Sequence, residues 1–109
     1  MILDPSPARA DLPDELFPLI DIMKPNEKEL SILTGMPTET DEEIKAAADA
    51  LLEKGVSKVV VTLGARGAML ADGNEKLFFE QSRLYLWIQR RPELHLLLQW
   101  SMDWHRKWE

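Results

Sequence analysis

The sequence contains no cysteine, which excludes a disulfide framework, a thiolate metal site and a cysteine nucleophile. It has no basic excess either. The 13 Lys and Arg stand against 19 Asp and Glu, and this net charge of −6 disfavours a nucleic-acid-binding surface. No apolar run reaches the length of a membrane span, and no basic, apolar leader is visible at the start. These absences favour a cytoplasmic protein without a nucleic-acid or membrane partner.

Glycine is missing from the last part of the chain. All five Gly lie before residue 80, whereas all four Trp, both His and the single Tyr lie after it. Residues 1–80 carry 8 basic and 16 acidic side chains, and residues 81–109 carry 5 and 3. A chain of 109 residues forms at most one domain. The change in composition therefore predicts a domain at 1–80 followed by an aberrant tail at 81–109.

Short apolar runs alternate with segments of helical periodicity before residue 80. We expect strands at 1–3, 20–23 and 58–63, helices at 12–17, 27–33 and 41–53, and a hairpin of 68–71 and 77–79. The expected helix caps are Asp11 for the first helix, Asn26 for the second, and Thr40 or Asp41 for the third. This order predicts an α/β fold with a mainly parallel sheet flanked by helices. The hairpin, turned at Asp72-Gly73, adds an antiparallel edge.

One stretch, Val59–Gly67, joins an expected buried strand to a glycine turn. Three consecutive valines are typical of a buried strand, and the turn Gly64-Ala65-Arg66-Gly67 has glycine at both ends. Ligands of open α/β sheets bind beyond the carboxyl ends of strands, and glycine lets the backbone approach a phosphate closely. A glycine turn also simply ends many strands. The residues of this stretch leave both interpretations open.

A polar pair begins the helix expected at 27–33. Asn26 follows a proline, and Glu29 stands three residues after it, which is the spacing of a capping box. Taken alone, the pair is best interpreted as a helix cap. Taken with the glycine turn, both residues also suit a site at the carboxyl ends of neighbouring strands.

In this order and spacing the motifs of residues 1–80 resemble the ribokinase-like (pfkB) family of carbohydrate kinases, and within it the ribokinase type. The residues match the middle-to-late part of the family sequence, including its Asn-x-x-Glu motif and its Thr-Leu-Gly-x-x-Gly nucleotide loop. The matching segments are Asp4-Pro5-Ser6-Pro7-Ala8, Lys24-Pro25-Asn26-Glu27-Lys28-Glu29, Leu33-Thr34-Gly35 and Thr62-Leu63-Gly64-Ala65-Arg66-Gly67. The resemblance implies a ribokinase-like fold, of which this chain is a part.

By this resemblance the family transfers the γ-phosphate of ATP to a sugar hydroxyl. Such a transfer needs positioning and charge neutralisation, which backbone donors and Mg²⁺ ligands supply. The resemblance implies that Asn26 contacts the nucleotide phosphates and that Glu29 helps to hold Mg²⁺, mostly through water. The nucleotide-binding residues that it implies are Asn26, Thr62, Gly64, Ala65, Arg66 and Gly67.

The family also needs a catalytic Asp in a Gly/Ala-Ala-Gly-Asp motif shortly after the hairpin. Residues 81–109 contain no Gly, and the family's sugar contacts belong to a half that would precede Met1. We therefore expect a kinase fragment without a catalytic residue and with little or no activity. Two alternatives stay open. One is a non-catalytic nucleotide-binding module, and the other is an interaction fragment whose apolar tail packs on a partner or a second copy.

The tail contains the family motif in another reading frame. In this frame the third base of each codon is read with the first two bases of the next codon. Trp87-Ile88 must then encode Asp, and residues 102–105 must encode Gly-Leu-Ala. The codons between them permit the family pattern except at the catalytic Asp, which Glu93-Leu94 cannot encode. This predicts a frameshifted tail. As written, residues 93–108 predict a helix after Pro92, with exposed Trp side chains that favour self-association.

Overall fold

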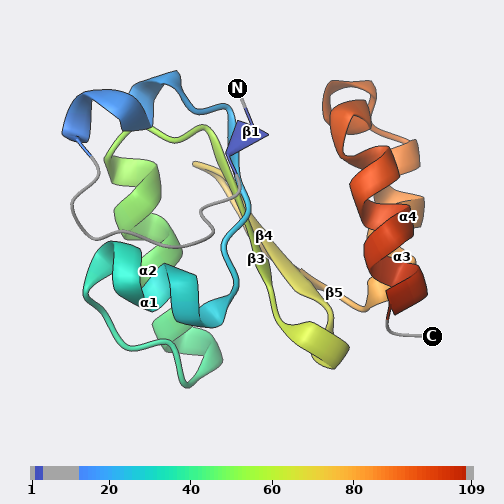
Figure 1. The fold of residues 1–109 in the computed structure, drawn as a ribbon, viewed down its shortest axis with the longest axis horizontal. Coiled ribbons are helices and arrows are strands. Elements are labelled where there is room, and N and C mark those ends of the chain that lie inside the picture. Colours follow the sequence, from blue (N-terminus) through green and yellow to red (C-terminus); the bar gives the residue numbers. More distant parts are fainter. Residues whose placement is uncertain (1, 4–12, 108–109) are drawn as a thin grey trace.

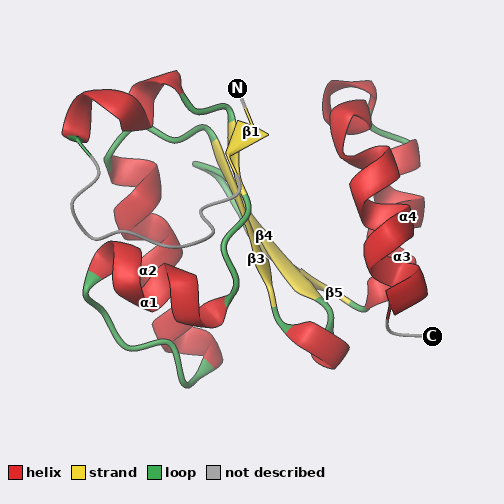
Figure 2. Ribbon diagram, viewed as in Figure 1, coloured by secondary structure: helices red, strands yellow, loops and turns green. Residues whose placement is uncertain are grey.

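A five-stranded sheet lies between two groups of helices (Figures 1 and 2). The structure, a computed structural model, describes residues 2–3 and 13–107. Its elements are β1 (Ile2–Leu3), η1 (Asp14–Leu19), β2 (Ile22–Met23), α1 (Glu27–Thr34), α2 (Asp41–Glu53), β3 (Lys58–Thr62), η2 (Gly64–Arg66), β4 (Ala68–Ala71), β5 (Lys76–Phe79), α3 (Gln81–Gln89), η3 (Pro92–Leu97) and α4 (Leu98–Lys107). The family-like segment 4–8 and the expected cap Asp11 lie outside the described residues.

The strands follow one another across the sheet in the order β1-β2-β3-β4-β5. The first three are parallel, and the hairpin β4–β5 is added antiparallel to β3. The chain therefore crosses from β2 to β3 through α1 and α2, as a parallel connection requires. This arrangement confirms the α/β fold class and the antiparallel edge.

Both faces of β3 are buried, and each face belongs to a different core. Val59 and Val61 face α1 and α2, in a cluster that also contains Met23, Leu30 and Ile44. Successive side chains of a strand point to opposite faces, so the valine between them faces the other way. Val60 joins the second cluster, which contains Ile22, Ala68, Leu70, Leu84, Ile88, Leu94 and Leu97.

The second core is covered by the last part of the chain. The helices α3 and α4 stand on the side of the sheet opposite α1 and α2 (Figure 1). The sequence predicts one helix at 93–108, whereas the structure has an additional helix, α3, and divides the rest into η3 and α4. Pro92 explains the break between α3 and η3, because proline lacks an N–H donor and disfavours helix in the residue before it. Residues 81–107 are thus packed against residues 1–80.

The helix boundaries follow local capping chemistry. Capping boxes begin α1 at Asn26 and α2 at Thr40, which decides between the two expected caps of α2. Gly35 ends α1 in a left-handed conformation at φ 68°. The expected helix at 12–17 was wrong in type and bounds. It is a 3₁₀ helix at 14–19, which begins after Pro13 and contains Pro18.

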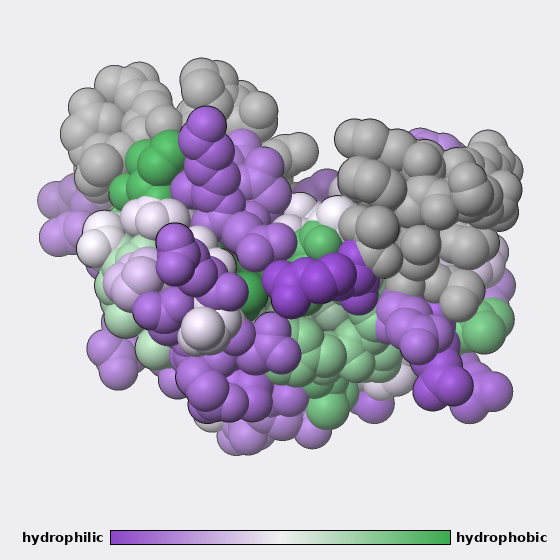
Figure 3. Space-filling model, turned by 90° about the horizontal axis from the view of Figure 1, so that it is seen from below, coloured by the Kyte–Doolittle hydropathy of each residue, from purple (hydrophilic) through white to green (hydrophobic). Residues whose placement is uncertain are grey.

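One face of the surface is mostly polar where its residues are described. The face in Figure 3 shows hydrophilic side chains around a smaller apolar area near its middle. Among residues 2–3 and 13–107, no helix combines the length and apolar character that a bilayer crossing demands.

The packing of α3 can be tested at Ile88. This side chain is fully buried, whereas Leu86 on the same helix is 57% exposed. We expect Ile88→Ala to lower the free energy of unfolding by about 2–4 kcal/mol, through lost burial and a cavity. Leu86→Ala should change it by less than about 0.5 kcal/mol. Urea denaturation followed by circular dichroism measures both values. Equally small losses would show that α3 does not pack on the sheet.

The hairpin turn predicts a pH dependence. Asp72 Oδ1 accepts hydrogen bonds from the N–H groups of Asn74 at 2.8 Å and Glu75 at 2.9 Å, and these bonds lower the pKa of the Asp72 carboxyl below 3.8. A lowered pKa in the folded state stabilises the fold above the unfolded-state pKa. That contribution is lost as pH falls through the folded-state value.

We therefore expect wild type to be more stable than Asp72→Asn near neutral pH and to lose this advantage in acid, as pH falls through the lowered folded-state pKa. Urea midpoints at the two pH values measure the difference. Asp72→Ala serves as the control, because it removes the acceptor at every pH. An advantage of wild type over Asp72→Asn that is the same at both pH values would contradict the assignment.

Candidate functional site

The carboxyl ends of β2 and β3 meet at one edge of the sheet. Asn26, after β2, forms an isolated parallel bridge with Thr62, the last residue of β3. The Thr62 N–H donates to the Pro25 carbonyl oxygen at 2.9 Å. The two motifs, far apart in the sequence, are therefore neighbours in space. They lie where open α/β sheets bind ligands.

Asn26 and Glu29 cap α1 reciprocally. Asn26 Oδ1 accepts from the Glu29 N–H at 2.7 Å, and Glu29 Oε1 accepts from the Asn26 N–H at 2.9 Å. The capping interpretation is therefore confirmed. Asn26 Nδ2 and Glu29 Oε2 make no hydrogen bond within the described part of the chain. Those two atoms stand at the positive end of α1, where anions bind favourably.

The turn after β3 is fixed by its glycines. Gly64 and Gly67 have φ of 62° and 112°, which favour glycine. The Leu63 N–H donates to the Gly67 carbonyl at 2.9 Å, and the Gly67 N–H donates to the Gly64 carbonyl at 3.2 Å. A Cβ atom on Gly67 would collide with the carbonyl oxygen of Phe79. Packing against β5 alone thus demands glycine here, apart from any ligand. Ala65 is the middle residue of η2.

Arg66 connects the turn to the first turns of α1 and α2. Its Nη2 lies 3.3 Å from Glu27 Oε2, and its Nη1 lies 3.7 Å from Asp41 Oδ1. The Arg66 side chain is 56% exposed, so these ion pairs contribute at most about 1 kcal/mol to stability. A phosphate that bound Arg66 would compete with both carboxylates. Sequence reasoning missed these partners, because no local pattern links three such distant positions.

The described residues contain no group of three or more His, Cys, Asp or Glu that could enclose a metal ion. Mg²⁺, however, keeps several waters and is usually held by one or two carboxylates together with substrate phosphates. Glu29, with one carboxylate oxygen outside the capping box, fits such an outer role. The donor set therefore suits a Mg²⁺ ion that arrives with a phosphate ligand, and not a separate protein cage.

Known proteins are similar in sequence to this chain. The model of the pfkB family carbohydrate kinases matches residues 1–83. A deoxyribokinase of Salmonella typhimurium is 36% identical over 96 residues, which cover 88% of this chain and 26% of the relative. A ribokinase of Arabidopsis thaliana is 47% identical over 76 residues, which cover 70% of this chain and 20% of the relative. The chain thus spans about a quarter of the length of these relatives.

Solved structures share the fold. Arabidopsis thaliana ribokinase complexed with ribose and ATP superposes with a TM-score of 0.62 at 42% identity, over 72% of this chain and 26% of that one. A protein named Sa239 superposes with a TM-score of 0.73 at 27% identity, over 95% of this chain and 40% of that one. Family match, identity and fold agree, and the chain therefore belongs to the pfkB family of carbohydrate kinases.

Proposed function

We propose that this chain carries part of the ATP site of a ribokinase-type carbohydrate kinase, which transfers the γ-phosphate of ATP to a sugar hydroxyl. The observation that carries the proposal is the juxtaposition of Asn26 and Thr62 beside the glycine turn. The solved ribokinase bound to ribose and ATP, 42% identical to this chain, supports a nucleotide and a sugar as ligands. A cytoplasmic location stays a prediction.

The proposed residues bind the phosphates, the metal ion and the rest of the nucleotide. The Asn26 amide and the first turn of α1 orient the phosphates, and Glu29 would hold Mg²⁺ through water. When bound, Mg²⁺ neutralises phosphate charge during transfer. The rest of the ATP site is formed by Thr62, Gly64, Ala65, Arg66 and Gly67. In this assignment the backbone of the turn approaches the nucleotide, because the glycines carry no side chain.

We assign no catalytic residue to this chain. The family motif with the catalytic Asp is expected shortly after β5, where the structure has α3 and η3. The proposed function of the chain itself is therefore nucleotide binding with little or no phosphoryl transfer. Self-association through the apolar tail stays a second candidate. The burial of Leu84, Ile88 and Leu94 in the second core leaves less of the tail for a partner.

The nucleotide site can be tested at Asn26 without unfolding α1. We expect saturable binding of Mg²⁺–ATP by wild type in isothermal titration calorimetry, and its loss in Asn26→Asp and Gly64→Val. Aspartate is an equally good helix cap but lacks the amide donor and repels phosphate. Circular dichroism should therefore show intact helix in Asn26→Asp.

Asn74→Ala, at an exposed turn residue, is the matched control and should bind like wild type. Wild type that does not bind Mg²⁺–ATP, or Asn26→Asp that binds it unchanged, would refute the assignment.

The coding DNA tests the proposed origin of the tail. If residues 81–109 are frameshifted, the codons of residues 86–90 read one base out of frame should give Val-Asp-Thr-Thr. Those of residues 102–105 must give Gly-Leu-Ala in either case, so they do not discriminate. Sequencing the gene, with the frame of residues 1–80 as control, measures this directly. Codons that yield another sequence at 86–90 would exclude the frameshift.

A further inference from the structure

The strand β5 forms one edge of the sheet. The Asp72 N–H donates to the Glu75 carbonyl at 3.0 Å, so these residues form a hydrogen-bonded pair at the hairpin turn. Such pairs alternate along an antiparallel ladder. Leu77 and Phe79 therefore bond to β4, whereas the N–H and C=O groups of Lys76 and Phe78 point outward. Outward-pointing backbone groups of this kind can pair with another chain.

Apolar side chains are exposed along this edge. Phe78 is 40% and Leu86 57% exposed. A hollow of about 380 Å³ lies between β5 and α3. Its lining residues are Phe78, Phe79, Arg83, Leu86, Trp87 and Arg90.

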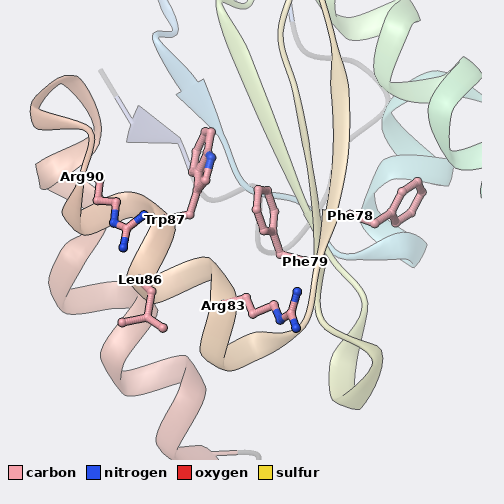
Figure 4. Close-up of a pocket in the computed structure, with 6 residues that line it drawn as sticks. All are labelled: Phe78, Phe79, Arg83, Leu86, Trp87 and Arg90. Atoms are coloured by element: carbon pink, nitrogen blue, oxygen red, sulfur yellow. The ribbon is translucent and has the colours of Figure 1, made fainter.

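The two faces of β5 differ. Phe79 points to Trp87 of α3, with ring centroids 5.0 Å apart, whereas Phe78 points to the other side of the strand (Figure 4). On that other side Lys45 of α2 lies over the Phe78 ring at 5.5 Å. The hollow therefore opens beside Phe79 and Trp87, and Phe78 presents its ring on the face of α2.

The charges at the two ends of β5 are opposite. Lys76 begins the strand, and Glu80 continues it in extended conformation at φ −69° and ψ 155°. In an antiparallel pair of two such strands centred on Phe78, Lys76 of each copy faces Glu80 of the other. Opposite charges directly across a ladder are favourable. Lys76 Nζ also lies 2.8 Å from Asp49 Oδ1, and Glu80 Oε2 lies 3.9 Å from Arg83 Nε, so an ion pair between copies competes with these two pairs within each chain.

We propose that β5 is a homodimerisation site, at which the edges of two copies pair antiparallel around Phe78. In this register the outward-pointing residues face one another, as a hydrogen-bonded ladder requires. The Glu80 carbonyl already accepts from the N–H groups of Arg83 and Leu84. The ladder between copies therefore uses both backbone groups of Lys76 and Phe78 and the N–H of Glu80. The two Phe78 rings meet on the face of α2. On the other face Leu77 of each copy lies opposite Phe79 of its partner, and Phe79 lines the hollow. The contact is two-fold and therefore closes at two copies.

Sedimentation velocity over a range of protein concentrations tests the dimer. We expect the mass to rise with concentration from 12.5 kDa toward twice that value. Phe78→Lys should abolish the rise, because it places like charges at the centre of the pair. Ile32→Lys is the matched control, since Ile32 is also 40% exposed, and it should dimerise like wild type. Phe78→Pro, which removes the ring and an outward N–H but no hydrogen bond to β4, is a second variant.

The end charges give a sharper test. Lys76→Glu and Glu80→Lys each place two like-charged pairs across the ladder and should weaken dimerisation about tenfold. A one-to-one mixture of the two variants restores opposite charges in the mixed dimer and should regain the wild-type mass. A wild-type chain that stays monomeric would overturn the proposal. So would equal effects of Phe78→Lys and Ile32→Lys, or a mixture that behaves like its separate components.

Discussion

Burial of both faces of β3 is the constraint on which the rest of the structure depends. A strand with valine at 59, 60 and 61 exposes apolar surface on one side unless both sides are covered. The helices α1 and α2 cover the side of Val59 and Val61. The tail covers the side of Val60, so a segment of unusual composition still completes the domain. Helices on both faces are the usual solution for the parallel part of a sheet.

The same strand also positions the candidate site. The register of β2 against β3 pairs Met23 with Val59, and this pairing determines that Asn26 meets Thr62 three residues later. The polar residues thus depend on apolar packing for their relative position. The capping box then fixes the positions of Asn26 and Glu29 more closely, because it holds both residues at the start of α1. The β2–β3 ladder therefore places core residues along its length and the candidate site at its carboxyl end.

The sequence predicted what depends on neighbours along the chain. The buried strand expected at 58–63 is β3, at Lys58–Thr62. This strand, the hairpin turn at Asp72 and the caps Asn26 and Thr40 follow from residues within a few positions of one another. The missed features depend on distant contacts or on absent signals. Glu80 begins α3 without a side-chain hydrogen bond, so no capping pattern announced that helix. The ion pairs of Arg66 and the contact between Gly67 and Phe79 join segments that only the folded sheet brings together. The ligand roles of the site residues stay predictions.

The contact between Gly67 and the Phe79 carbonyl holds the two ends of the hairpin together. The backbone leaves the glycine turn at residue 67 and returns against the same point at residue 79. The tip of the hairpin, at Gly73 and Asn74, is exposed and distant in the chain from this junction. Inserted residues at the tip would lengthen the hairpin without moving either of its ends. For an engineer, this tip is an attachment point for a label or a fused peptide that keeps the turn in place.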